Sequence, residues 1–113
     1  MNLAYHLVSK AYLDSLDAGA DYAPAAFSQD GFIHCTDAPD EMARVANLFY
    51  KSEPPPHCYL YIDKDRVRAP VRYDDAAHKY PHIYGGLNRD AIIAVHPAGR
   101  DAEGNFLPPE DSG

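Results

Sequence analysis

Tryptophan is absent from this chain of 113 residues, cysteine occurs only twice, and basic residues are few, ten against 17 acidic ones, for a formal net charge of −7. Nucleic-acid binders usually gather Lys and Arg into a patch or stripe. The scattered basic residues here predict that neither nucleic acid nor an anionic membrane surface is a partner. Cys35 and Cys58 lie in apolar runs, where free thiols commonly behave as small buried hydrophobes, so no disulfide framework is expected.

Long apolar runs are missing as well. None approaches the ~20 residues that span a bilayer, and the opening MNLAYHLVSK lacks the charged start and apolar run of a secretory signal. We therefore predict a soluble, cytoplasmic protein that forms a single domain over residues 1–113, with a loose C-terminal tail from about residue 108. The oligomeric state stays open.

The common nucleotide and metal motifs are also absent. The chain has no phosphate loop, G-x-G-x-x-G, C-x-x-C, H-E-x-x-H or G-x-S-x-G. Standard nucleotide folds, zinc ribbons, zincins and α/β hydrolases are therefore disfavoured. What the chain does have is nine tyrosines, whose apolar body and polar tip favour half-wet surfaces such as cleft walls.

The N-terminal third predicts a strand, a helix and a loop. The alternation in LAYHLVS (3–9) indicates a strand, with His6 and Val8 on one face. Ser9 is expected to cap a helix over about 10–18, which Gly19 closes. Residues 20–30 are expected to form a loop.

The rest of the chain adds one helix and several strands. GFIHCT (31–36) reads as a strand, and a helix over about 36–51 follows it, capped by Thr36 or Asp37. Its apolar face consists of Met42, Val45, Ala46 and Phe49. Further strands are expected at 58–63, 71–74, 81–85 and 91–96. Their short links suit antiparallel neighbours, so the fold class is α+β, with small mixed, mostly antiparallel sheets and two main helices.

Strand alternation also predicts which side chains share a face. His34 lies with Phe32 and Thr36, whereas Cys35 faces the other way, so His34 cannot readily activate Cys35 as a nucleophile. In the strand at 58–63, alternate apolar residues face the core. Tyr59, Tyr61 and Asp63 are expected to face outward or toward a cleft.

Histidine is the residue type most suited to chemistry here. Three of the six, His6, His34 and His82, lie inside predicted strands or at a strand opening. A buried imidazole needs a hydrogen-bond partner, and clustering in one cleft would supply partners and create a site. Two alternatives stay open: each histidine is structural, or the three hold a zinc ion with an open position. Their long, irregular spacing does not favour zinc, and no metal is expected.

Other polar residues have competing interpretations. Tyr84 shares a face with His82. Arg72 either grips an anion or balances Asp74 and Asp75, which form a carboxylate pair or a solvated turn. Asn88 serves a turn or contributes to the site. The predicted ligand-binding positions are Thr36, Tyr84, Asn88 and Arg72.

Several blocks of the sequence resemble the bacterial domain-of-unknown-function family numbered 952. They are YHLVSKAYLDSLDAGADY, GFIHCT, YLYID, VRYD and YPHIYGGLN, and they cover about residues 3–97. GFIHCT and PHIYGGLN are the specific ones. The sequence departs from the family's usual residues at Thr36 (usually Ser), Tyr80 (Phe), Gly86 (Pro) and Asp74 (Glu).

The resemblance implies an ADP-ribosyltransferase-like fold, and with it NAD as a possible substrate. By similarity, His6 would bind the nicotinamide ribose, His34 would line the nicotinamide pocket, and His82 or Tyr84 would stand where transferases usually have Glu. A neutral imidazole stabilises positive charge on a sugar less well than a carboxylate does. Removal or transfer of a small group is therefore expected rather than protein ADP-ribosylation. The alternatives are a non-catalytic nucleotide-binding or regulatory module and a histidine-based metal site.

Overall fold

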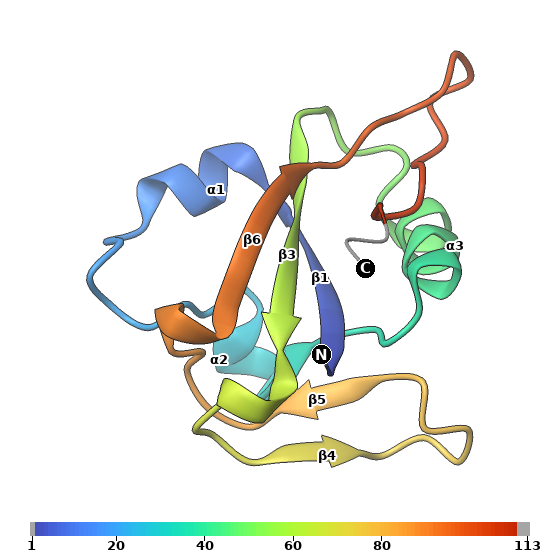
Figure 1. The fold of residues 1–113 in the computed structure, drawn as a ribbon. Helices are drawn as coiled ribbons and strands as arrows, with labels where there is room; N and C mark the ends of the chain where they lie inside the picture. The colour runs from blue at the N-terminus through green and yellow to red at the C-terminus, as the bar shows by residue number, and fades with distance from the viewer. Residues whose placement is uncertain (1, 111–113) are drawn as a thin grey trace.

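The computed structural model describes residues 2–110 as two three-stranded sheets with helices around them, shown in Figure 1. The strands are β1 (Leu3–Ser9), β2 (Ile33–His34), β3 (His57–Asp63), β4 (Val71–Tyr73), β5 (Pro81–Ile83) and β6 (Ile92–Pro97). The helices are α1 (Lys10–Ser15), α2 (Phe27–Asp30) and α3 (Pro39–Phe49), with 3-10 turns η1 (Lys64–Arg66) and η2 (Arg89–Ala91). All paired strands are antiparallel, which confirms the predicted α+β class.

A backbone bridge joins β1 to the residues that follow β2, and so connects the two sheets. The sheet orders are β1-β3-β6 and β2-β5-β4. Tyr5 N–H donates to the carbonyl of Thr36 at 2.8 Å and Thr36 N–H donates back at 2.9 Å. In Figure 1, β4 and β5 run crosswise beneath the sheet of β1, β3 and β6. Beyond this bridge, toward α1, the outer edge of β1 has no strand beside it within residues 2–110.

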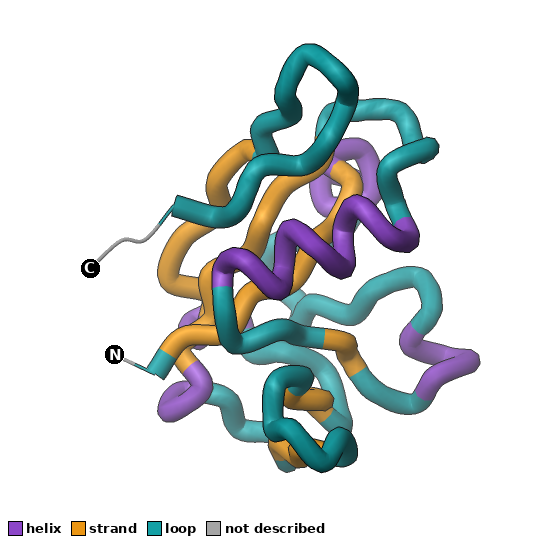
Figure 2. Tube along the Cα trace, turned by 90° about the vertical axis from the view of Figure 1, so that its right-hand side faces the viewer, coloured by secondary structure: helices purple, strands orange, loops and turns teal. Residues whose placement is uncertain are grey.

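Both faces of the β1-β3-β6 sheet are buried. One face packs against the loops and the second sheet around Leu60 and Ile62. The other carries Tyr59 and Tyr61, both 1% exposed, which pack with Met42 of α3 and other side chains. Figure 2 shows α3 in front of the strands on this side. The prediction that both tyrosines face outward or toward a cleft is therefore wrong for Tyr59, whereas Tyr61 is buried and lines a small pocket beneath the C-terminal segment.

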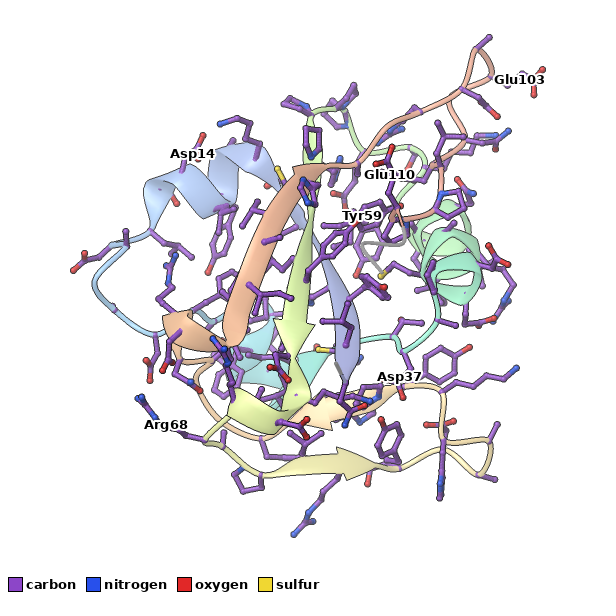
Figure 3. The ribbon with its side chains drawn as sticks, viewed as in Figure 1. Asp14, Asp37, Tyr59, Arg68, Glu103 and Glu110 are labelled. Atoms are coloured by element: carbon purple, nitrogen blue, oxygen red, sulfur yellow. The ribbon has the colours of Figure 1, made fainter. Side chains whose placement is uncertain are left out.

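The C-terminal segment explains this burial. The Tyr59 hydroxyl, whose side chain is labelled in Figure 3, donates to the carbonyl of Leu107 at 2.7 Å. The Tyr61 hydroxyl donates to the carbonyl of Glu110 at 2.9 Å. Pro109 is buried. The segment predicted to be loose from about residue 108 thus contacts the sheet as far as Glu110, and residues 111–113 lie outside the described residues.

The first helix is shorter than the apolar pattern predicts. Ser9 caps α1 as expected, because its Oγ accepts from Tyr12 N–H at 3.2 Å. The helix ends at Ser15, where Leu16 is already extended, so Gly19 is not the cap. The predicted loop over 20–30 holds α2, which ends at Gly31 in the left-handed region with φ 77°.

Helix α3, predicted over about 36–51, differs from its prediction at both ends. Its N-cap is Ala38, not Thr36 or Asp37. Thr36 is instead paired with β1, and Asp37 accepts a hydrogen bond from Lys64 Nζ at 2.7 Å. Phe49 belongs to the predicted apolar face of this helix, yet it is 67% exposed. Within residues 2–110 no helix has the length and apolar character needed to cross a membrane.

Candidate functional site

A cavity of about 730 Å³ lies along the open edge of β1, and we call it the β1-edge pocket. Its size is in the range usual for small-molecule sites. The loop at 22–26 and α1 contribute one side, and α3 contributes another. The polar and charged side chains that line it come from His6, Ser9, Tyr12, Tyr22, Asp30, His34, Thr36, Tyr50 and Glu53.

The backbone of β1 contributes a donor and an acceptor to this pocket. Tyr5 points its N–H and C=O away from β3, toward Thr36. Hydrogen-bonding direction alternates along an antiparallel strand, so Leu7, two residues on, also points its N–H and C=O away from β3. Leu7 lines the pocket. Within residues 2–110 no strand pairs with this edge of β1, so the N–H and C=O of Leu7 face the pocket.

His6 is buried in the wall of the pocket with both ring nitrogens bonded. Its Nδ1–H donates to the carbonyl of His34 at 2.6 Å, so its Nε2 accepts from the Tyr22 hydroxyl at 2.7 Å. Burial lowers the pKa of His6 from 6.5 to about 4, and burial raises the pKa of Tyr22. His6 is therefore a neutral imidazole in one fixed tautomer.

His34 and His82 form a second, more open arrangement. They are direct cross-strand partners on β2 and β5, and their ring centroids are 5.3 Å apart. The ring of Phe32 stacks on His82 with centroids 4.1 Å apart. Each imidazole contacts a carboxylate: His34 Nε2 is 3.1 Å from Asp30 Oδ2, and His82 Nδ1 is 3.0 Å from Asp74 Oδ2.

Tyr84 and Arg72 extend this imidazole cluster across the second sheet. The Tyr84 hydroxyl donates to the same Asp74 carboxylate, which raises the pKa of Tyr84. The hydrogen bonds from Tyr84 and His82 lower the pKa of Asp74. Arg72 is the cross-strand partner of His82 on β4, and its guanidinium lies 5.3 Å from the centre of the Tyr84 ring.

The predicted site residues therefore fall into three places. His6, His34 and Thr36 line the pocket, whereas His82, Tyr84 and Arg72 lie beside it on the second sheet and connect to it through His34. Asn88 lies away from both. Its side chain accepts from Arg68 N–H and donates to the carbonyl of Arg66.

The sequence patterns do not identify Tyr22 or Asp30 as site residues, and they place Phe32 on the face of His34 without assigning it to the site. The spacing of four between Asp30 and His34 was a usable signal. Tyr22 offered none, because it reaches His6 from a loop 16 residues away.

The adjacent aspartates separate: Asp74 contacts His82, and Asp75 accepts from the backbone N–H of Lys79 at 2.8 Å. Across the described part of the chain, no three His, Cys, Asp or Glu side chains are grouped to hold a metal ion.

Comparison with solved structures finds two chains that share the fold of this protein. The crystal structure of protein CC0527 from Caulobacter crescentus matches with a TM-score of 0.76 at 20% identity, over 95% of this chain and 93% of that one. A double mutant of CC0527 matches equally well. At this identity the likeness shows a shared fold only. No curated protein matches the sequence.

The family comparison covers most of the chain. Residues 7–95 match the model of the family described as "Protein of unknown function (DUF952)". This confirms the family resemblance of the sequence blocks, whereas the ADP-ribosyltransferase-like fold stays a prediction. The chain belongs to the DUF952 family.

Proposed function

We propose that this chain binds NAD or an ADP-ribosyl compound in the β1-edge pocket and removes or transfers the ADP-ribosyl group. The observation that carries the proposal is the pocket itself, which opens beside His6, His34 and Thr36. His6 and His34 are the strand positions at which the resemblance implies contacts to the nicotinamide ribose and base. A pocket of about 730 Å³ has room for that end of the ligand.

The edge of β1 supports a carboxamide ligand. A primary carboxamide, like the Asn side chain, presents both N–H donors and a carbonyl acceptor. The N–H and C=O of Leu7 point the same way, so they can pair with both groups of one amide as a neighbouring strand would. Nicotinamide carries such a group.

The imidazole cluster supplies the acid–base chemistry in this proposal. A hydroxyl nucleophile attacks the anomeric carbon, the bond to nicotinamide breaks, and the hydroxyl proton passes to an imidazole. Asp74 holds Nδ1–H of His82, which leaves Nε2 to take the proton. Asp30 holds His34 by Nε2 in the same way, which leaves its Nδ1. His34 and His82 are the catalytic residues in this scheme.

The role of His6 differs from the one that the resemblance implies. Both of its ring nitrogens are engaged inside the protein, so a hydrogen bond to ribose would cost one of these buried contacts. We therefore assign His6 to holding β2 against β1 in the wall of the pocket.

A specific observation favours the second candidate, a binding module without turnover. The resemblance implies that His82 or Tyr84 stands where transferases usually carry a carboxylate, and the nearby Asp74 is already engaged by both His82 and Tyr84. Weak stabilisation of positive charge on the sugar would slow bond cleavage while binding is retained.

Ligand binding is tested by thermal unfolding with millimolar NAD and ADP-ribose. A ligand at 100 times its Kd stabilises the fold by about 2.7 kcal/mol, so Tm should rise by several degrees. Ala26→Trp should fill the pocket and abolish the rise, whereas Ala102→Trp, in the exposed C-terminal loop, should keep it. No rise with either ligand would contradict both candidate functions.

Turnover is tested by chromatography of released nicotinamide. His34→Ala and His82→Ala should each lower the rate by about 100-fold. His96→Ala removes an exposed imidazole of β6 and should change little. Binding of NAD without release would favour the module. Release that survives both His34→Ala and His82→Ala would refute their catalytic assignment.

A further inference from the structure

The charged side chains in the wall of the β1-edge pocket, imidazoles apart, are acidic. Asp30 enters from the end of α2 and Glu53 from the turn after α3, and among the described residues no Lys or Arg joins the lining. Both are open to solvent, with side chains 37% and 51% exposed. His34 contacts Asp30 Oδ2 and His57 contacts Glu53 Oε1, which leaves the second oxygen of each carboxylate for a ligand.

Aromatic rings complete this wall. Tyr12, Phe49 and Tyr50 line the pocket, and the last two are 67% and 38% exposed. The Tyr12 ring is fixed, because its hydroxyl donates to the carbonyl of Ala23 at 2.7 Å. The face of an aromatic ring attracts cations, so rings and carboxylates favour the same charge.

The negative charges of Asp30 and Glu53 both affect Tyr50 in the pocket wall. Burial raises the pKa of Tyr50, and the negative charges of Glu53 and Asp30 raise it further. Two acidic side chains from different parts of the chain thus place their field at a single aromatic ring. Anions are repelled from this wall, and neutral ligands gain less from it than cations do.

We infer that the β1-edge pocket selects compact organic cations, and that Asp30 and Glu53 set this specificity. The inference rests on the proposed function in that the same pocket holds the ligand. For NAD it means that the positively charged, oxidised nicotinamide ring enters the pocket in preference to the neutral, reduced ring. The diphosphate then lies outside the acidic wall.

Calorimetry with a matched pair of probes tests this inference. 1-Methylnicotinamide carries a permanent positive charge, whereas nicotinamide has the same ring and amide without it. At pH 8 and low salt, we expect the cation to bind about tenfold more tightly. Asp30→Asn and Glu53→Gln should each weaken the cation about three- to tenfold and leave nicotinamide unchanged.

A third variant controls for the overall charge of the chain. Glu103 lies at the tip of the C-terminal loop, away from the strands in Figure 3, and it is exposed. Glu103→Gln removes the same charge as Glu53→Gln but should leave both affinities unchanged. A loss of cation binding in Glu103→Gln equal to that in Glu53→Gln would overturn the assignment to the pocket.

The remaining outcomes separate this inference from the proposed function. Equal affinity for the two probes, or binding of neither at millimolar concentration, would overturn the inference even if NAD binds. Selective binding of 1-methylnicotinamide, abolished by Ala26→Trp and without any response to NAD or ADP-ribose, would support the inference and refute the proposed function.

Discussion

The imidazoles of His6 and His82 lie on different sheets and are held in opposite ways. His6 is 7% exposed, and both of its nitrogens are bonded inside the protein. His82 is half-buried, its ring stacks on Phe32, and the ring's one hydrogen bond within residues 2–110 joins Nδ1 to Asp74. The first arrangement leaves no nitrogen for a ligand, and the second leaves one.

This contrast divides the histidines of the site by task. His6 ties together β1, the carbonyl of His34 and Tyr22, so it fixes the shape of the pocket wall. His34 and His82 each have one ring nitrogen bonded to a carboxylate, and in the proposed function the other nitrogen takes the proton. All three histidines are candidates because they lie inside predicted strands or at a strand opening. Burial then decides whether each imidazole is structural or has a nitrogen open to a ligand.

Removal of the His6 side chain should have the largest effect on stability of the proposed substitutions. His6→Ala leaves the buried Tyr22 hydroxyl and the carbonyl of His34 without a partner and opens a cavity, so we expect a loss of about 3–5 kcal/mol in unfolding free energy. His34→Ala, as the matched control, should cost less than about 1 kcal/mol. Urea denaturation measures both, and equal losses would contradict the division of tasks.

Acid should weaken the fold through the same residue. The folded pKa of His6 is about 4, against 6.5 ordinarily, so between these values the unfolded chain takes up a proton that the folded chain does not. Stability is therefore full above about pH 7 and falls as the pH falls toward 4. At about 1.4 kcal/mol per pH unit, the loss from this group reaches about 3 kcal/mol.

Comparison with His6→Gln isolates this contribution. The variant lacks the titrating ring, whereas the other ionisable groups of the chain remain. Denaturation curves between pH 4 and 7.5 should therefore show a steeper decline for the natural chain than for the variant. Parallel declines would show that His6 does not carry the acid sensitivity.

Local signals in the sequence predicted part of the local structure, although the caps expected at Gly19 and at Thr36 or Asp37 are not the observed ones. Ser9 was expected to cap a helix, and its hydroxyl does so. Alternation placed Phe32 and His34 on one face, and their rings lie 4.6 Å apart, whereas Cys35 is buried on the other face. These predictions need only neighbouring residues, because the period of a strand is two.

Contacts between distant segments were beyond such patterns. Tyr59 and Tyr61 look half-exposed by alternation, but residues near 106–110 cover them from almost 50 positions away. In the site, the six histidines gave three candidates, yet nothing local showed that Tyr22 would satisfy His6 or that Asp74, rather than Asp75, would face His82.

Cys35 and its neighbour His34 differ in exposure although they are adjacent in the chain. It follows the open His34 but is 3% exposed, and burial raises its pKa to about 12. The reactive thiolate is therefore scarce at pH 8, and we expect no alkylation of Cys35 by iodoacetamide in the folded protein. Peptide mapping should find rapid labelling only in urea. Rapid labelling of the folded chain would mean that the two faces of β2 are not separated as described, and Cys35 would again be a candidate nucleophile.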